Sequence, residues 1–244
     1  MERIAVVSHK GGSGKTTVSV NLAGALAAAG HLVLVVDVDP QAAAGAALGV
    51  PPEPPTLIEV LAGRAQPADA IRPSSTNRLS VLPASLDLAG AEVALPDSDD
   101  WQAALRRVLE RVEGFDYVVV DTAPGLGVLP YLAMMAADRV LAICPPDFLA
   151  YRALPSVLEA ASQADVELIG IVPNQIEHRT RHEADVLAEL HANHGEQLLS
   201  EIPRRVVLRD AAIAGLPVTT YAPSSDAATA FGRLAAEVAP EVVA

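Results

Sequence analysis

The chain has 244 residues, of which 51% are hydrophobic and 19% are charged, and its formal net charge is −13. This length admits one large domain or two small ones, and the acidic balance argues against a protein that coats nucleic acid by bulk charge. The single cysteine, Cys144, excludes an internal disulfide and any four-cysteine metal or iron–sulfur site within one chain. With no signal-like start and no long uncharged apolar run, we expect a cytoplasmic protein.

Short apolar, β-branched runs recur along the chain and predict buried strands at residues 4–7, 32–36, 79–82, 117–120, 139–143 and 168–172. Most are followed by segments that predict helices, at residues 15–29, 100–113, 149–164, 180–194 and 224–238. This alternation predicts an α/β fold: a doubly wound, mostly parallel sheet with helices on both faces, in a single domain over residues 1–244. We expect residues 200–223 to hold two short edge strands around a helix at 205–214.

The stretch SHKGGSGKTT, residues 8–17, follows the first predicted strand and opens the first predicted helix. Its glycines permit positive φ angles, and the helix N-terminus supplies free N–H groups and a positive dipole end. Together they predict an anion site sized for phosphates, with Lys15 at the β/γ-phosphates and the Thr16 hydroxyl on Mg²⁺. The strict G-x-x-x-x-G-K-[ST] pattern fails at one position, because His9 replaces the first glycine.

Both lysines of the chain lie in this stretch, whereas every other basic residue is one of 15 arginines. One lysine suffices for the phosphates of a bound nucleotide, so Lys10 is surplus. Either it has a separate role or it is a solvated lysine at the loop edge. The residues expected at the nucleotide of their own chain, through side chain or backbone, are Gly11, Gly12, Ser13, Gly14, Lys15, Thr16 and Thr17.

The sequence KGGxGKTT with the extra lysine resembles the deviant Walker A motif of the ParA/MinD group of P-loop ATPases. In that family the extra lysine crosses a dimer interface to the ATP held by the other subunit. The resemblance therefore implies that Lys10 is both a catalytic group and a sensor of the ATP-bound dimer. It also implies ATP, ADP and Mg²⁺ as cofactors.

Two acidic segments are expected to complete the site at the carboxyl edge of the sheet, where open parallel sheets bind ligands. In LVLVVDVDPQ, Asp37 and Asp39 are predicted just past a strand and on one side of it. The resemblance implies that Asp37 is linked to the Mg²⁺ shell and that Asp39 positions or activates the attacking water. Asp39 before Pro40 also fits a simple turn. YVVVDTAPGLG fits a Walker B strand in which Asp121 holds Mg²⁺ through water.

Two residues are predicted near the adenine base. Asn174 follows a predicted strand, and its amide offers both a donor and an acceptor to an adenine edge. Residues 202–238 closely resemble the C-terminal end of ParA/Soj-type proteins. In relatives an Asn after this strand often contacts the base, and the Pro of an IPR-like segment, here Pro203, lies near it.

A set of arginines in the C-terminal half is the candidate DNA surface. In ParA/Soj relatives, basic residues of this half form a DNA-binding surface made continuous by dimerisation. The candidates here are Arg179, Arg181, Arg204, Arg205 and Arg209. Residues 179–209 also hold five acidic residues, so an ordinary solvated helix face is the alternative.

The resemblance predicts a ParA/Soj-type partitioning ATPase that forms an ATP-dependent sandwich dimer and binds DNA nonspecifically on the nucleoid. A ParB-type activator would stimulate its slow hydrolysis. The alternatives are a ParA-like ATPase that positions a non-chromosomal cargo and a biosynthetic P-loop synthetase. A MinD-like membrane switch would end in a basic amphipathic helix. The end GRLAAEVAPEVVA is acidic and interrupted by proline, so we expect no membrane partner.

Overall fold

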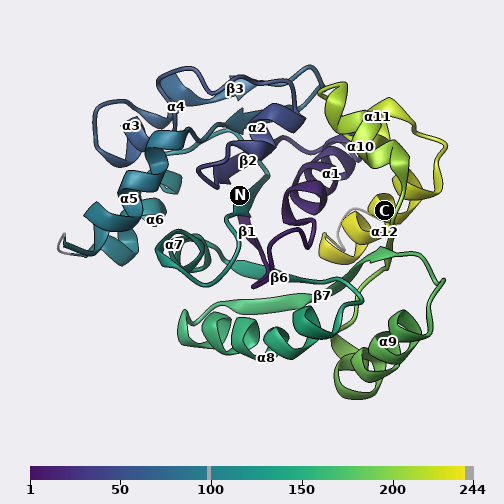
Figure 1. Cartoon of the computed structure of the whole chain (residues 1–244). Coiled ribbons are helices and arrows are strands. Elements are labelled where there is room, and N and C mark those ends of the chain that lie inside the picture. Colours follow the sequence, from purple (N-terminus) through teal and green to yellow (C-terminus); the bar gives the residue numbers. More distant parts are fainter. Residues whose placement is uncertain (98–99, 240–244) are drawn as a thin grey trace.

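The strands of the chain form an eight-stranded sheet in the computed structural model, which describes residues 1–97 and 100–239 (Figure 1). The order is β3-β4-β2-β5-β1-β6-β7-β8, and neighbours are parallel except for β3, which is antiparallel to β4. This topology confirms the predicted doubly wound fold class. The strands are β1 (Glu2–Val7), β2 (Val33–Val38), β3 (Arg72–Pro73), β4 (Leu79–Leu82), β5 (Tyr117–Thr122), β6 (Arg139–Cys144), β7 (Glu167–Ile176) and β8 (Ile202–Pro203).

Helices pack on both faces of the sheet and bury two hydrophobic clusters (Figure 1). Residues of one cluster come from α3 (Leu57–Leu61), α4 (Pro67–Ala70), α5 (Ala89–Ala94), α6 (Ala104–Leu109), α7 (Val128–Ala136), α8 (Phe148–Gln163) and α9 (Arg181–His194). Residues of the other come from α1 (Lys15–Ala28), α2 (Ala43–Ala47), α10 (Val206–Ile213), α11 (Val218–Tyr221) and α12 (Asp226–Val238). Alternate strand residues serve the two clusters, as the two-residue period of a strand requires.

The central strands are buried on both sides, and their sequences are therefore almost continuously apolar. All six residues of β2 are buried, and so are the last five of β5. The loops after β1, β2 and β5 leave the sheet at the same edge because these strands are parallel. The glycine-rich loop and the acidic segments predicted from the sequence are thereby brought to one place.

The second edge strand predicted within residues 200–223 is wrong, because Val218–Tyr221 form the short helix α11 instead. The Val218 N–H donates to Asn21 Oδ1 at 2.6 Å, so it is not available to a strand. Pro217 packs directly on α1 over Gly24, where a Cβ would lie 2.3 Å from the proline Cβ. Docking on α1 therefore decides the conformation of this segment.

Several predicted boundaries also shift. β2 includes Asp37 and β7 includes Asn174, so both residues lie inside strands and not after them. Polar side chains at the sheet edge do not end a strand whose backbone stays paired, as the Asp37–Asp121 pairing shows. The helix predicted at 100–113 is shorter, because the hydrogen bonds of the Arg111 and Val112 N–H groups span three residues and form turns.

Within the described residues, no helix is long and apolar enough to cross a membrane. The last part of the acidic C-terminal end, residues 240–244, lies outside the described residues.

Candidate active site

The glycine-rich loop joins β1 to α1 and has the backbone that a phosphate site needs. Gly12 and Gly14 have positive φ angles of 73° and 88°, and Gly14 is the N-cap of α1. A Cβ on Gly14 would lie 2.4 Å from the Asn174 amide nitrogen, so only glycine fits there. The loop therefore presents backbone N–H groups next to the N-terminus of a 14-residue helix, an arrangement that binds phosphates.

The two lysines of this loop occupy different environments. The Lys15 side chain is buried, and burial lowers the pKa of its ammonium, whereas the charges of Asp121 and Asp39 act to raise it. The Lys10 side chain is 39% exposed, and its Nζ lies 2.7 Å from Asp147 Oδ1 at the start of α8. One cation thus lies within the site while the other remains accessible at its rim.

Asp121 is fully buried at the end of β5 and accepts two hydroxyl hydrogen bonds. Thr16 Oγ1 donates to it at 2.7 Å and Ser19 Oγ at 2.8 Å. Burial raises the pKa of Asp121 to about 6, although these hydrogen bonds and Lys15 oppose the shift. Sequence reasoning missed Ser19. Its spacing of three residues from Thr16, on the same helix face, was the available signal.

Asp37 is the neighbour of Asp121 in the sheet and is also fully buried. Its carboxylate accepts the backbone N–H groups of Asp39 at 3.1 Å, Ala44 at 3.0 Å and Gly45 at 3.2 Å. Burial and the charge of Asp121 raise the pKa of Asp37 to about 8. Two buried carboxylates side by side are costly unless a cation neutralises them.

The donor set at this point fits a hard divalent cation. The Thr16 hydroxyl and the carboxylates of Asp37 and Asp121 provide oxygen ligands only, which Mg²⁺ prefers. Lys15 is the single buried lysine nearby and cannot neutralise both acids. The three residues predicted to hold Mg²⁺ are therefore brought into one cluster.

Asp39 lies beyond the end of β2 and is partly exposed. Its Oδ1 accepts the Gln41 N–H at 2.9 Å, which is the turn contact considered as the alternative. Its other carboxylate oxygen makes no hydrogen bond with any described residue, and its charge acts on Lys15. Asp39 thus shapes the turn and still has one carboxylate oxygen without a partner among the described residues.

A cavity of about 370 Å³ adjoins the glycine-rich loop and is also lined by residues of β7, β8 and α10. Its walls include Gly12, Gly14, Thr17, Asn174, Gln175, Pro203, Arg204, Arg205, Leu208 and Arg209. Asn174 is buried, and its Nδ2 donates to the Ser13 carbonyl oxygen at 2.7 Å. Asn174 and Pro203 therefore lie where a base would follow the phosphates, and their contact with adenine stays a prediction.

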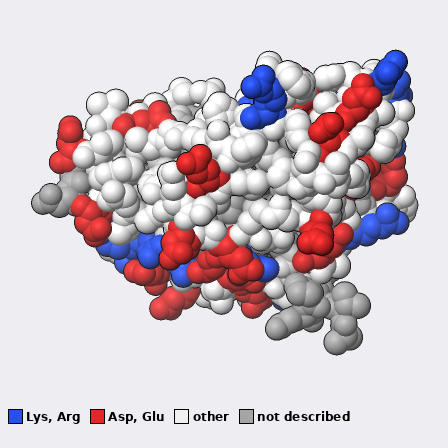
Figure 2. All heavy atoms as spheres, turned by 90° about the horizontal axis from the view of Figure 1, so that it is seen from below, with Lys and Arg blue, Asp and Glu red and all other residues white. Residues whose placement is uncertain are grey.

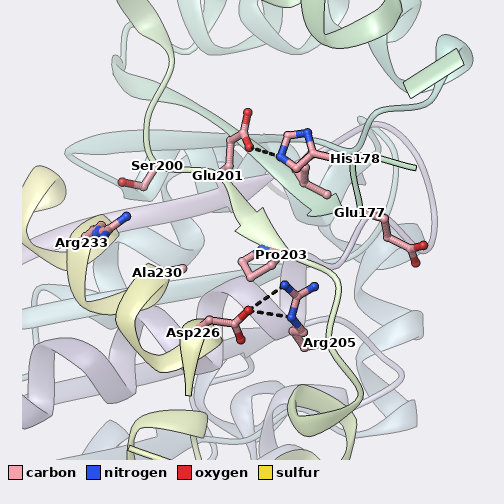
Figure 3. Close-up of a pocket in the computed structure, with 10 residues that line it drawn as sticks. Glu177, His178, Ser200, Glu201, Pro203, Arg205, Asp226, Ala230 and Arg233 are labelled. Atoms are coloured by element: carbon pink, nitrogen blue, oxygen red, sulfur yellow. Dashed lines mark hydrogen bonds and ion pairs between the residues drawn. The ribbon is translucent and has the colours of Figure 1, made fainter. Parts of the chain in front are cut away.

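A second cavity, of about 330 Å³, shares Pro203 and Arg205 with the first and has charged walls (Figure 3). Figure 3 shows Arg205 beside Asp226 and His178 beside Glu201, with Arg233 farther along the wall. The Arg205 guanidinium approaches Asp226 Oδ2 to 2.7 Å. Opposite charges are thus already paired across this cavity.

The five candidate DNA-binding arginines do not form one free basic patch. Arg179 and Arg204 lie 3.5 Å and 3.4 Å from Glu177 oxygens, Arg181 lies 3.9 Å from Asp185, and Arg205 pairs with Asp226. Arg209 makes no ion pair with a described residue, and it lines the cavity beside the glycine-rich loop together with Arg204 and Arg205. Figure 2 shows one face of the molecule, on which basic side chains are interspersed with acidic ones.

Two family models match the chain, each over more than half its length. A model described as an AAA domain matches residues 1–169, and one described as 4Fe-4S iron sulfur cluster binding proteins, NifH/frxC family, matches residues 116–243. The cluster itself does not fit this chain. Cys144 is the single cysteine, it is buried, and burial raises the pKa of its thiol to about 12. Such a cluster takes four thiolates.

Relatives and solved structures match almost the whole chain. The chromosome-partitioning ATPase Soj of Thermus thermophilus is 36% identical over 99% of this chain and 97% of its own length. The septum site-determining protein MinD of Pyrococcus horikoshii, complexed with Mg-ADP, is 30% identical with a TM-score of 0.84. The match covers 99% of this chain and 97% of the MinD chain.

Cobyrinic acid a,c-diamide synthase of Mycobacterium smegmatis, with a bound ATP analog and magnesium, is 32% identical with a TM-score of 0.82. The match covers 96% of this chain and 93% of the synthase chain. Three observations agree on the family: the fold, the glycine-rich loop with two lysines, and the 36% identity to Soj over nearly the whole chain. This chain belongs to the ParA/Soj family of P-loop ATPases.

Proposed function

We propose that this chain, as one ATPase domain over residues 1–244, is a nucleotide-driven partitioning switch. It pairs with a second copy when ATP is bound, holds nonspecific DNA on the nucleoid in that state, and is released by slow hydrolysis that a ParB-type partner stimulates. At the level of the family the statement is simpler: the chain is a partitioning or positioning P-loop ATPase, and its cofactors are ATP or ADP with Mg²⁺.

The position of Lys10 is the observation that carries the dimer proposal. Lys15 is buried within the loop, so it is the lysine placed to serve the nucleotide of its own chain. Lys10 lies at the rim, partly exposed, and its ion-pair partner is an equally exposed carboxylate. An ammonium on a flexible stem in this position can be exchanged to an anion on a second copy.

Hydrolysis needs mainly positioning and charge neutralisation, and the site supports both. Lys15 and the loop N–H groups would hold the phosphates, and Asp39 would orient the attacking water through its unpaired oxygen. Thr16, Asp37 and Asp121 would hold Mg²⁺, which supplies neutralisation of the phosphate charge when bound. Lys10 would complete the charge balance only in the dimer, so hydrolysis would depend on pairing.

A specific observation favours a second candidate function, the positioning of a cargo other than DNA. Four of the five candidate arginines are paired with carboxylates, and the whole chain carries a charge of −13. A ParA-like ATPase that positions a non-chromosomal cargo would use the same site with another outer surface. A biosynthetic synthetase would also keep the phosphate site, but it would have no need of nucleotide-dependent pairing.

One experiment separates the three. The oligomeric state and the retention on nonspecific DNA are measured without nucleotide, with ADP, and with ATP on an Asp39→Ala variant. ATP-dependent dimers that remain on DNA support the partitioning switch, and dimers that ignore DNA support the cargo positioner. Monomers in every state contradict both. A Lys10→Ala change in the Asp39→Ala background is the control, and it should abolish pairing.

A further inference from the structure

Two neighbouring amide side chains hold two neighbouring carbonyl groups of the glycine-rich loop. Asn174 Nδ2 donates to the Ser13 carbonyl oxygen at 2.7 Å, and Gln175 Nε2 donates to the Gly12 carbonyl oxygen at 2.8 Å. Both amides also lie close over Gly14, where a Cβ would be 2.4 Å from the first amide nitrogen and 3.3 Å from the second. The end of β7 is thus fastened to the loop at two consecutive peptide units.

Consecutive residues of a regular strand point to opposite faces, so these two side chains should not reach the same loop. They do so because Gln175 has a φ of 63°, in the left-handed region that residues with a side chain rarely adopt. The pairing of β7 with β8 is irregular at the same place, between Asn174 and Ile176. An unfavourable backbone conformation that places a side chain on a ligand loop is typical of functional sites.

The contact has a direct consequence for the N–H groups of the loop. In a trans peptide unit the C=O and the following N–H point in opposite directions. When Gln175 holds the Gly12 carbonyl toward β7, the Ser13 N–H must point away from β7, into the loop. Asn174 does the same for the Gly14 N–H through the Ser13 carbonyl.

We propose that Gln175 is a positioning residue for phosphate binding: it orients the Ser13 N–H through the Gly12 carbonyl, paired with Asn174 acting on the next peptide. This inference rests only on nucleotide binding by the loop, and not on dimerisation or DNA binding. The unfavourable backbone conformation at Gln175 then has a purpose, because it keeps the loop in its phosphate-binding arrangement before the nucleotide arrives. A preformed loop avoids the ordering cost of binding.

The test compares two substitutions that remove the amide in different ways. Gln175→Met keeps the length of the side chain without a donor, and Gln175→Gly also relieves the left-handed backbone. Asp165→Gly is the matched control, because Asp165 is exposed, has a φ of 53°, and follows α8 away from the loop. Dissociation constants are measured for ADP with Mg²⁺ and for adenosine, together with thermal unfolding of the nucleotide-free protein.

Both Gln175 variants should bind ADP roughly fivefold more weakly than the parent chain, which is the scale of one lost hydrogen bond. Both should bind adenosine as tightly as the parent chain does. Gln175→Gly should unfold at the same or a higher temperature, as Asp165→Gly should, so that its weaker ADP binding is not a folding defect. ADP affinity at the parent level in both variants would overturn the proposal. An equal loss for adenosine would also overturn it, because Gln175 would then contact the base. The proposed partitioning function can fail in the dimer and DNA assays without changing either result.

Discussion

Lys10 Nζ lies 2.7 Å from Asp147 Oδ1, and the same oxygen caps helix α8 by accepting the N–H groups of Leu149 and Ala150. The hydrogen bond from Lys10 is the main cause that holds the pKa of Asp147 below its ordinary value. In the unpaired chain, the lysine proposed to reach a second copy is therefore engaged by its own chain. Asp147 and the nucleotide of a partner would compete for one ammonium.

Asp147→Asn should strengthen ATP-dependent pairing. Asparagine caps a helix about as well as aspartate, so α8 should stay intact while the charge that engages Lys10 is lost. Because the pair is well exposed, we expect at most about a fivefold fall in the dimer dissociation constant. Sedimentation of the ATP-bound Asp39→Ala protein, with and without Asp147→Asn, measures it. Weaker pairing would contradict the prediction and would mean that Asp147 itself contacts the partner.

The nucleotide-free protein should lose stability as the pH rises from about 4 to 8. The pKa of Asp37 is raised to about 8 and that of Asp121 to about 6 in the folded state, above the value of about 3.9 for an unfolded aspartate. The folded chain therefore keeps protons that the unfolded chain has lost in this range, and the unfolding free energy falls as pH increases.

Denaturant unfolding at a series of pH values checks this dependence, and Asp37→Asn should flatten it. The parent chain and Asp37→Asn are compared because repulsion within a chain of net charge −13 also lowers the unfolding free energy as acids ionise. Mg²⁺ with ADP should stabilise the parent chain more at pH 8 than at pH 6, since the carboxylates must be ionised to bind the cation. An unchanged slope in Asp37→Asn would contradict the assignment of the dependence to Asp37.

Gly14→Ala should reduce nucleotide affinity by roughly tenfold or more. Alanine at a φ of 88° is strained, and its Cβ would displace the Asn174 amide that holds the loop. Gly63→Ala is the control, because Gly63 has a φ of 69° and a Cβ added there would meet no atom within 4 Å. Calorimetric titration with ADP compares the two. Equal affinities would mean that the amide contact is dispensable.

Arg209→Ala should weaken ADP and ATP binding by roughly fivefold, the scale of one lost hydrogen bond, because Arg209 lines the cavity beside the loop. Arg181→Ala should leave nucleotide affinity unchanged, since its side chain is 94% exposed on α9 and pairs with Asp185. DNA retention is measured for both at saturating ATP in the Asp39→Ala background. Normal nucleotide affinity with lost DNA retention in Arg209→Ala would assign Arg209 to a DNA surface instead.

Much of the site could be predicted from the sequence because its parts are local. A strand, a glycine-rich turn and a helix around Lys15 determine the phosphate loop within one continuous segment, residues 2–28. Asp37 and Asp121 each end an apolar run, and parallel pairing brings such ends together in any doubly wound sheet. The pattern of buried strands and intervening helices therefore sufficed for the fold class and the acidic cluster.

The tertiary structure alone decided which distant groups meet. Asp147 engages Lys10, and Gln175 holds Gly12 only because its backbone turns left-handed at an irregular strand pairing. Val218 forms a helix and not a strand because Asn21 takes its N–H. These contacts join residues far apart in the chain, and hydrophobic periodicity records which face a residue occupies but not which partner it finds there.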